Sequence, residues 1–559
     1  MVSISRLMKR TVPVFAGCLI FSLLLHWRAG TFASDFGRYP DEGMHYINGL
    51  LVRDFLTSGQ WLHPMSFARA FYAHFPKVSI GQWPPVYDLM QAAWSLVFGE
   101  SRVSLLWGMQ MLTAGLAAVT FRAGELGGAH PVFAAAGAAL LIASSLTQYV
   151  SSMVMAEAPL AMFSLLAILA WIRFQESSRT RDGAWFGLWT MLAIMTKGDA
   201  WLIPIVVVEA IILTRSWRIL RQRGFWTAVV LISVVCVPYY LVTLRILTQG
   251  WDSQAVQPLS YLAASLRHHL RFTIDAIGIP LSVVALIGMT GRVFVALGKR
   301  RLPETFWLVM TLYGATILLF HVMVPTSIEA RKIYQIVPVV CLFVSAGLGY
   351  GARRLRGGWA DRGIQTSIVA STAAIYAFRG FSLLAPFEPG FRPGVQVLLS
   401  RPETATEAIL ISSNPVFDDS EAALIAEWAG RRRHAGTYLV RATKLLSHPV
   451  PNSSGGLSFV ADASTPDELR ARLAAIPIAY TIVHTRPATQ SYPHHELLRT
   501  TLLAHPEEWD LIYSSRKQAL GQENEIEIFR YRKSVSGAPI HYDIDLSRKI
   551  NETIEINRP

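Results

Sequence analysis

Long apolar segments, separated by short polar ones, fill the first two thirds of the chain. A membrane-spanning helix needs about 20 apolar residues. Segments of this kind start near Val12, Val103, Pro131, Met155, Ala184, Asp199, Phe225, Phe272, Glu304, Ile333 and Ile364. The pattern predicts a polytopic α-helical membrane protein with about 11 transmembrane helices. The composition agrees, since 52% of the 559 residues are hydrophobic and only 16% are charged.

The connection after the first span, about residues 32–102, is too long for a simple link. It carries two amphipathic stretches, one with Ile47, Leu50, Leu51 and Phe55 at helical spacing and one that opens at Pro84-Pro85. We predict two helices that lie at the membrane interface. If the second stretch crossed the membrane, the topology would be inverted, and the alternation of basic loops further along the chain argues against that.

Alternate connections between the spans are rich in arginine and lysine, which the positive-inside rule assigns to the cytoplasm. The strongest such clusters hold Arg6, Lys9, Arg10, Arg122, Arg173, Arg179, Arg181, Arg215, Arg218, Arg221, Arg223, Lys299, Arg300, Arg301, Arg353, Arg354, Arg356 and Arg362. A cytoplasmic N-terminus and outward-facing segments around residues 41, 157, 197 and 331 follow. A single helix over 184–214 would break this alternation, so we prefer two short helices interrupted at Thr196-Lys197-Gly198. The net charge of +13 does not indicate nucleic-acid binding, because much of the excess lies in these loops.

The composition changes from about Glu388 onward. Apolar runs shorten to strand length at 408–411, 479–483 and 511–513, the run 525–531 alternates like a strand with one exposed face, and Thr465-Pro466 begins a helix. We therefore predict a transmembrane domain over residues 1–386 and a soluble extracytoplasmic α/β domain over 387–559. Its polar tail after about Ser534 is expected to be poorly ordered.

Ionisable residues gather in four of the outward-facing segments, at Asp41-Glu42, Glu157, Lys197 and Arg331-Lys332. Ionisable groups at membrane depth usually face a cavity and mark a site. Carboxylates can deprotonate an acceptor, and cations can hold a phosphate. Plain structural roles stay open for each: a helix cap, a helix start, a snorkelling lysine and an anchor at the end of a span.

Five motifs, in order, carry a resemblance to a known family. They are Tyr39-Pro40-Asp41-Glu42-Gly43-Met44-His45-Tyr46, Pro84-Pro85-Val86-Tyr87 leading to Phe98-Gly99, Glu157-Ala158-Pro159, Thr196-Lys197-Gly198, and Arg331-Lys332-Ile333-Tyr334 with Pro338. Over about residues 10–350 the chain resembles the GT-C superfamily of membrane glycosyltransferases, in the branch of protein O-mannosyltransferases and lipid A aminoarabinose transferases. The family usually has an aromatic residue directly after the arginine of the last motif, where this chain has Lys332.

The resemblance implies transfer of a hexose or pentose from a polyprenyl-phosphate donor, with inversion, on the outer face of a bacterial inner membrane. The acceptor class, whether lipid, glycan or protein, stays open, as does a divalent cation as cofactor. We assign Asp41 as general base, Glu42 as an orienting group and Glu157 as a second acid. Phosphate-binding cations are Lys197, Arg331 and Lys332, with lining residues His45, Tyr46, Tyr87 and Tyr334.

Two other classes of function compete with this interpretation. A transporter or flippase for a lipid-linked saccharide could also use charges at membrane depth, but we see no repeated halves in the sequence. A scaffold or sensor that acts through the outer α/β domain would not depend on the charged residues.

Overall fold

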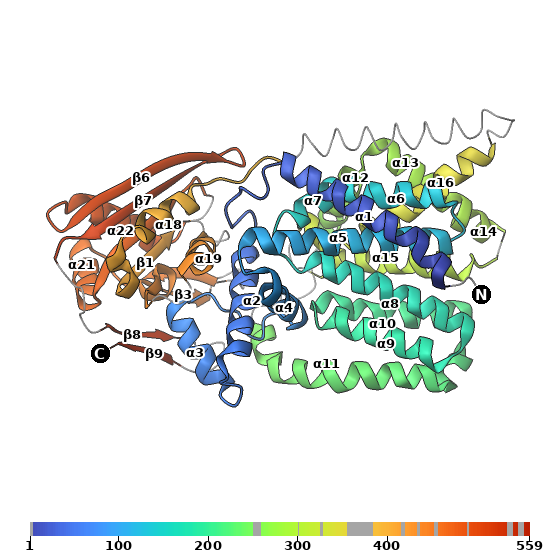
Figure 1. Ribbon diagram of the computed structural model, residues 1–559, viewed down its shortest axis with the longest axis horizontal. Coiled ribbons are helices and arrows are strands. Elements are labelled where there is room, and N and C mark those ends of the chain that lie inside the picture. The colour runs from blue at the N-terminus through green and yellow to red at the C-terminus, as the bar shows by residue number, and fades with distance from the viewer. Residues whose placement is uncertain are drawn as a thin grey trace.

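A helical bundle with an α/β unit at one end makes up the computed structural model of the chain (Figure 1). The structure describes residues 4–249, 259–299, 301–324, 328–354, 384–414, 420–432, 436–451, 457–488, 491–533, 540–545 and 553–558. The N-terminus lies at the end of the bundle far from the α/β unit, which we call the far end.

Most helices of the bundle begin within a few residues of a predicted span start. The span predicted from Phe272 is an exception, because one helix there runs from Leu259 to Ile277 and the next begins at Ile279. The helices of the bundle are α1 (Ile4–Arg28), α5 (Arg102–Leu126), α6 (Pro131–Ala143), α7 (Ser145–Ser151), α8 (Glu157–Ser177), α9 (Thr180–Ile194), α10 (Leu202–Thr214), α11 (Arg223–Gln249), α12 (Leu259–Ile277), α13 (Ile279–Met289), α14 (Val295–Gly298), α15 (Thr305–Met323) and α16 (Ile336–Arg354). Among the described residues, six helices are long and apolar enough to cross a membrane, or seven if α6 and α7, which meet at 56°, form one bent span. The count of about 11 spans stays a prediction, and the span expected from Ile364 lies outside the described residues.

The interruption predicted at Thr196-Lys197-Gly198 is confirmed. Helix α9 ends at Ile194, a 3₁₀ turn, η1 (Gly198–Trp201), follows, and α10 starts at Leu202. At one end of this helical pair Lys197 contacts Glu157, the first residue of α8. At the other end Gln222 donates a hydrogen bond to Ser178 at 2.8 Å, just past the last residue of α8. The chain therefore turns back at η1, and the arginines that flank the pair lie together at the far end.

The long first connection folds into three short helices, α2 (Asp41–Ser58), α3 (Pro64–His74) and α4 (Val86–Phe98). Helices α2 and α4 were predicted, whereas α3 was not. The 13 residues of α4 are too few to cross a bilayer. A Cβ atom at Gly49 would lie 2.9 Å from the side chain of Gln91, so the two predicted helices pack closely at that position.

A five-stranded mixed sheet of order β2-β1-β5-β7-β6 forms the centre of the α/β unit. Its strands are β1 (Ala408–Ser413), β2 (Tyr438–Arg441), β5 (Ile478–Thr485), β6 (Trp509–Ala519) and β7 (Gln522–Tyr531). Strands β2, β1 and β5 are parallel, and β7 runs antiparallel to both β5 and β6. All six residues of β1 are buried, which agrees with its continuous apolar sequence. The strands predicted here and the helix start at Thr465 are confirmed.

Helices and two small hairpins complete this unit. They are α18 (Phe391–Leu399), α19 (Ser420–Arg432), α20 (Ala442–Leu445), α21 (Pro466–Ala475), α22 (Pro493–Ala504), β3 (Ser447–Pro451) with β4 (Leu457–Ala461), and β8 (Ile540–Asp545) with β9 (Thr553–Arg558). The tail was expected to be poorly ordered, and that expectation is wrong for β8 and β9, which pair in register from Ile540–Arg558 to Asp545–Thr553. Alternation at 540–545 is a strand signal that the overall polarity of the tail obscured.

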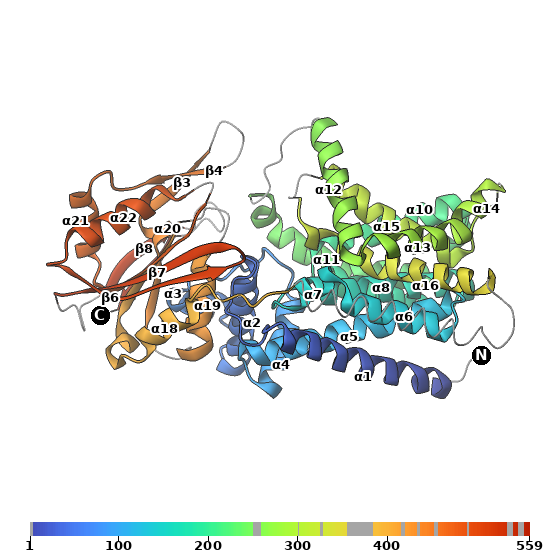
Figure 2. The same ribbon diagram turned by 90° about the horizontal axis from the view of Figure 1, so that it is seen from above.

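The two units meet where α2 packs against α19, and Figures 1 and 2 both place these helices between the sheet and the bundle. A Cβ atom at Gly43 would lie 2.5 Å from the carbonyl oxygen of Ala422, so only glycine permits this approach. Arg392 donates hydrogen bonds to the carbonyls of Ala33 and Ser34 at 2.9 and 2.6 Å and lies 3.5 Å from the carboxylate of Asp35. The loop that leads to Asp41 is thus clamped by the α/β unit.

Candidate active site

Arg331 is the centre of a charged network at the end of the bundle next to the α/β unit. It lies in a 3₁₀ turn, η4 (Ala330–Ile333), just before α16, and its side chain is only 7% exposed. Its three nitrogens donate to three carboxylates: Nη2 to Asp41 at 2.9 Å, Nη1 to Glu157 at 2.8 Å and Nε to Glu329 at 2.7 Å. The structure therefore joins the first, third and fifth motifs at one guanidinium.

The fourth motif joins this network through Glu157. Lys197 Nζ lies 2.8 Å from Glu157 Oε1, the same oxygen that accepts from Arg331. A buried carboxylate is normally unstable in its charged form, but here two cations compensate the charge of Glu157. Its second oxygen, Oε2, is buried and has no hydrogen-bond partner among the described residues. That oxygen is free to accept a bond from a ligand or water.

The adjacent acids Asp41 and Glu42 face different surroundings. Glu42 is fully buried and pairs with Arg102, whose Nη2 lies 2.8 Å from Glu42 Oε1. The other Glu42 oxygen accepts from the backbone N–H of Gly37 at 3.0 Å. Because Arg102 also donates to the carbonyls of Thr31 and Ser34, Glu42 fixes the shape of the loop. Asp41 therefore belongs to the network around Arg331, whereas Glu42 pairs with Arg102 outside that network.

Lys332 differs from its neighbour Arg331. Its amino group makes no ion pair or hydrogen bond with any residue that the structure describes, although the side chain is half-buried. Burial lowers the pKa of Lys332, and the positive charge of Lys197 lowers it further. An additional anion placed beside Lys332 and Lys197 would therefore be stabilised. Arg331, in contrast, already uses all its nitrogens.

Burial also shifts the acid and the tyrosine that contact Arg331. It raises the pKa of Asp41, and the charges of Arg331 and Lys197 oppose that rise only in part. Burial likewise raises the pKa of Tyr39, whose hydroxyl donates to Glu329 at 2.7 Å and accepts from Arg331 at 2.8 Å. A carboxylate with a raised pKa is a stronger base once it is deprotonated, which suits proton abstraction.

Two of the predicted lining residues, His45 and Tyr87, are in edge-to-face contact beside this network. The imidazole of His45 lies 4.2 Å from the ring of Trp83 and 5.4 Å from that of Tyr87, centroid to centroid. Burial lowers the pKa of His45 to about 3, so the ring is neutral, and its buried Nδ1 has no partner among the described residues. The hydroxyl of Tyr334 is also buried without such a partner.

Tyr46, the remaining predicted lining residue, lies away from the network. Its hydroxyl donates to the carbonyl of Glu100 at 2.8 Å, and its ring packs on Phe36 at 4.6 Å. On the helix α2 it follows His45 directly, and neighbouring residues of a helix face different directions. Tyr46 therefore contributes to packing of the loop.

Tyr39 and Glu329 belong to the network but were absent from the predicted site. The guanidinium of Arg331 lies 3.9 Å from the centroid of the Tyr39 ring, which adds a cation–π contact. Both residues stand two positions from a predicted one, Tyr39 before Asp41 and Glu329 before Arg331. The sequence signal was present, because an acid and an aromatic ring are the usual partners of a buried arginine.

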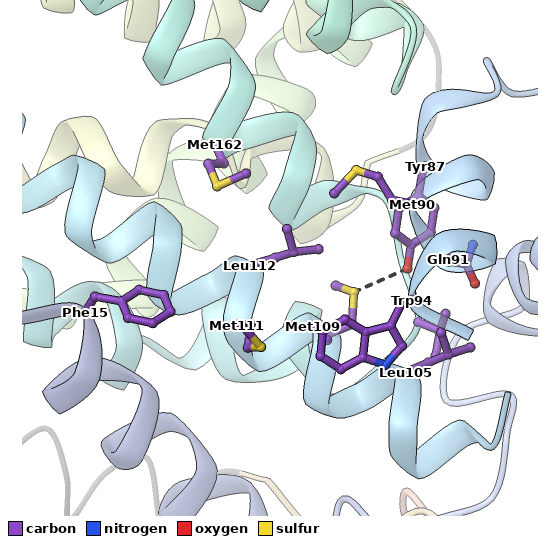
Figure 3. A pocket seen from close by; sticks show the side chains of 12 residues that line it. Phe15, Tyr87, Met90, Gln91, Trp94, Leu105, Met109, Met111, Leu112 and Met162 are labelled. Carbon is purple, nitrogen blue, oxygen red and sulfur yellow. Dashed lines mark hydrogen bonds between the residues drawn. The ribbon is translucent and has the colours of Figure 1, made fainter. Parts of the chain in front are cut away.

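An apolar pocket of about 260 Å³ lies on the other side of Tyr87 (Figure 3). Helices α1, α4, α5 and α8 and the segment before α8 supply its lining, which includes four methionines. The hydroxyl of Tyr87 contacts the sulfur of Met109 at 3.3 Å inside this pocket. Tyr87 thus contacts His45 with its ring and has its hydroxyl in an apolar cavity.

No group of three His, Cys, Asp or Glu side chains that could hold a metal ion occurs within the described part of the chain. The acids of the network are paired with cations instead.

Comparison with known proteins relates this arrangement to a family. Residues 82–241 match the sequence model of the family described as dolichyl-phosphate-mannose-protein mannosyltransferase (PMT_2). A search of curated proteins by sequence finds no match.

Solved structures share the fold over most of the chain. ArnT from Cupriavidus metallidurans bound to undecaprenyl phosphate aligns with a TM-score of 0.56 at 14% identity, covering 93% of this chain and 98% of ArnT. The apo state of ArnT gives a TM-score of 0.53 at 14% identity, with coverage of 91% and 98%. Archaeal oligosaccharyltransferase AglB from Archaeoglobus fulgidus, in complex with an inhibitory peptide and a dolichol-phosphate, gives 0.54 at 11% identity, with coverage of 85% and 69%.

The sequence family and the solved structures that resemble this chain both consist of membrane glycosyltransferases. The chain has the GT-C fold, a helical membrane bundle followed by a unit with a mixed sheet. The resemblance to GT-C membrane glycosyltransferases that the five motifs predicted is confirmed.

Proposed function

We propose that this protein transfers a sugar from a polyprenyl-phosphate donor to an envelope acceptor, and that the charged network around Arg331 is the catalytic centre. One observation carries the proposal: carboxylates and cations from four separate segments converge where the bundle meets the α/β unit. Burying so many charges costs free energy, and a scaffold acting through the α/β unit would not require it. The lipid-linked ligands in the structures of ArnT and AglB, an undecaprenyl phosphate and a dolichol-phosphate, support this class of donor.

Asp41 acts as the general base in this proposal. Its Oδ2 is fixed by Arg331 at 2.9 Å, and its side chain keeps 19% of its surface exposed, so an acceptor can reach it. The carboxylate takes the proton from an acceptor hydroxyl or amine, whose oxygen or nitrogen forms a bond to the anomeric carbon. The bond from that carbon to the lipid phosphate oxygen breaks at the same time, which inverts the configuration.

Lys332 and Lys197 receive the phosphate. The leaving group gains negative charge as its bond to the sugar breaks, and preplaced cations stabilise that charge most effectively. Lys332 has no ion pair among the described residues and lies within electrostatic reach of Lys197. Since the guanidinium of Arg331 is engaged by Asp41, Glu157 and Glu329, we assign it to positioning.

The apolar pocket beyond Tyr87 would take part of a prenyl chain. Its lining is almost entirely carbon and sulfur, and Met111, at its edge, is 41% exposed on the outside of the bundle. An isoprenoid segment there would replace lipid contacts without desolvating a polar group. Substitution of Met109 by tryptophan should fill the pocket and weaken binding of undecaprenyl phosphate, while Asp41 stays unchanged.

The orientation follows from the two ends of the bundle. The catalytic network and the α/β unit share one end, and the arginine-rich turns lie at the far end. If the far end is cytoplasmic, as the positive-inside rule requires, the reaction occurs on the outer face of the inner membrane. Labelling of a single cysteine introduced at position 59, an exposed turn after α2, with a membrane-impermeant reagent would test this orientation.

The decisive experiment has two stages. Mass spectrometry of envelope glycans, lipids and glycoproteins, with and without the protein, identifies the transferred sugar and its acceptor by their mass difference. Purified protein is then assayed with the corresponding polyprenyl-phosphate sugar. Asp41→Asn should lower turnover by on the order of a hundredfold or more. Wild-type turnover in this variant would exclude Asp41 as the base, and an unchanged envelope would exclude the proposed function.

A further inference from the structure

The far end of the bundle holds a second groove, of about 470 Å³, at the start of α11. Arg221, Arg223, Trp226, Thr227, Val230 and Leu231 line it. The short turn η2 (Trp217–Arg221) that leads into α11 adds Arg218, and Arg215 ends the preceding helix. This groove, which we call the α11 groove, is separated from the catalytic network by the length of the bundle.

The four arginines around the α11 groove are exposed, and none forms an ion pair with the residues that the structure describes. Three other arginines at this end are paired. Arg10 lies 3.3 Å and Arg122 2.8 Å from the same Glu125. Arg173 lies 3.0 Å from Asp182. The uncompensated positive charge at this end therefore includes the four arginines of the groove, together with Arg179 and Arg181 at the start of α9.

Two exposed tryptophans flank these arginines. Trp217 is 54% and Trp226 is 55% exposed, and the indole N–H of Trp226 donates to the carbonyl of Leu220 at 2.9 Å, which fixes the ring against the turn. Tryptophan at this position is typical of the head-group level of a bilayer. The two tryptophans therefore favour a position of the groove at the level of the phospholipid phosphates.

An exposed apolar stripe continues from the groove along α11. Trp226, Val230, Val234, Val237 and Leu241 are all more than two-fifths exposed. Their spacing of four, four, three and four residues places them on one face of the helix. An acyl chain that follows this face would begin at the arginines.

We propose that the α11 groove binds an anionic phospholipid of the surrounding bilayer, with its phosphate at Arg221 and Arg223 and an acyl chain along the stripe of α11. Charge complementarity selects an anionic head group, since four uncompensated guanidinium groups surround the opening. Arginine suits phosphate because its donors form a planar fork. The proposal is independent of the sugar-transfer reaction, because it uses no residue of the catalytic network.

The test uses the full-length protein in detergent and native mass spectrometry. Phosphatidylglycerol or phosphatidylcholine with matched acyl chains is titrated in, and the bound lipid is counted. We expect one phosphatidylglycerol to bind at least about fivefold more tightly than phosphatidylcholine, the discrimination that about one basic residue supplies near the surface. The double variant Arg221→Gln/Arg223→Gln should lose that preference.

A matched control removes the same charge from the same end of the bundle. Arg10 and Arg173 are each about two-thirds exposed and each paired with an acid, so Arg10→Gln/Arg173→Gln should keep the preference. Equal loss in both double variants would show a non-specific charge effect and overturn the proposal, as would equal binding of the two lipids.

A second measurement locates the lipid without relying on those variants. Phosphatidylglycerol with a photoactivatable acyl chain is crosslinked to wild-type protein, and the labelled peptide is identified. Labelling at Val230, Val234 or Val237 supports the proposal. Labelling confined to other helices, or displacement of the lipid by undecaprenyl phosphate at stoichiometric amounts, contradicts it.

Discussion

Arg331 and Asp41 are 290 residues apart in the chain, and their side chains meet at 2.9 Å. The same guanidinium also holds Glu157 at 2.8 Å, so one cation sets the positions of two acids. A structural ion pair at a surface would be exposed and weak, whereas this arginine is 7% exposed. Such burial of Arg331, with Asp41 still partly open to solvent, would fix the proposed base without blocking access to it.

Glu42 should be needed for folding rather than for chemistry. Glu42→Gln leaves Arg102 buried without a countercharge, and breaking a buried pair by removing one partner costs about 3–5 kcal/mol. We expect the thermal unfolding temperature in detergent to fall clearly, while Asp41→Asn, at a partly exposed position, changes it little. A variant Glu42→Gln as stable as wild type would show that Arg102 finds another partner.

Lys332 and Arg331 should differ in their effect on KM for the donor. Lys332→Gln removes the proposed phosphate contact, so KM for the donor should rise by about tenfold. Its kcat should also fall, because that contact strengthens as the leaving group gains charge. Arg331→Lys keeps the charge but loses the fork that holds two acids, so kcat should fall. Steady-state kinetics of both variants test this, and a larger KM effect in Arg331→Lys would reverse the two assignments.

Turnover should depend on pH through Asp41. The base works only when deprotonated, so kcat/KM rises with pH through its pKa and then levels off. Because burial raises the pKa of Asp41 and Arg331 partly lowers it, the acidic limb should lie above pH 3.8 in wild type. Arg331→Gln removes the opposing cation, so the limb should move to higher pH. An acidic limb at the same pH in both proteins would show that the titration of Asp41 does not control kcat/KM.

Much of the membrane part could be predicted because its signals are local. The lengths of the apolar segments located most of the helices. The alternation of basic turns predicted a break at Lys197, and in the structure the chain turns back there, so that the arginines flanking α9 and α10 lie at the same end of the bundle. The convergence of Asp41, Glu157, Lys197 and Arg331 also followed from topology, since all four were assigned to one side. Helix and strand types in the α/β unit followed wherever an apolar run was continuous, as in β1.

The parts that escaped prediction depend on tertiary contacts. The different surroundings of Asp41 and Glu42 come from Arg102, which is 60 residues from Glu42 and carries no motif. Tyr46 faces away from the charged network because α2 begins at Asp41, and the start of a helix fixes the direction of each side chain that follows. Sequence patterns locate such a boundary poorly. The clamp between Asp35 and Arg392 joins a loop to the first turn of α18, and no periodicity relates two such distant segments.

The contact between α2 and α19 should tolerate no side chain at Gly43. A Cβ atom there would lie 2.5 Å from the carbonyl oxygen of Ala422, and backbone on both sides leaves no flexible group to move. Gly43→Ala should therefore destabilise the junction and lower turnover through displacement of Asp41, two residues earlier. Gly17→Ala in α1, where no atom lies within 4 Å of the added Cβ, is the control. Proteolysis between the units and the thermal unfolding temperature report the effect.

The junction should also weaken as pH rises. Burial and the nearby charge of Glu427 raise the pKa of Asp35 to about 6, although Arg392 opposes the shift. A carboxyl group with a raised pKa binds its proton more tightly in the folded than in the unfolded state. Its stabilising contribution is therefore complete below its ordinary pKa near 4 and is lost as pH rises through about 6.

Asp35→Asn tests this directly, because the amide keeps the size of the carboxyl group and cannot titrate. We expect the thermal unfolding temperature of wild type, measured in detergent from pH 4 to pH 7, to decrease with pH relative to that of the variant, with most of the decrease between pH 4 and pH 6. Asp467→Asn serves as control, since the side chain of Asp467 is 87% exposed and α21, which carries it, lies at the end of the α/β unit away from the bundle (Figure 1). Parallel pH profiles for wild type and Asp35→Asn would show that Arg392 holds Asp35 charged throughout, and the clamp would then be an ion pair at every pH.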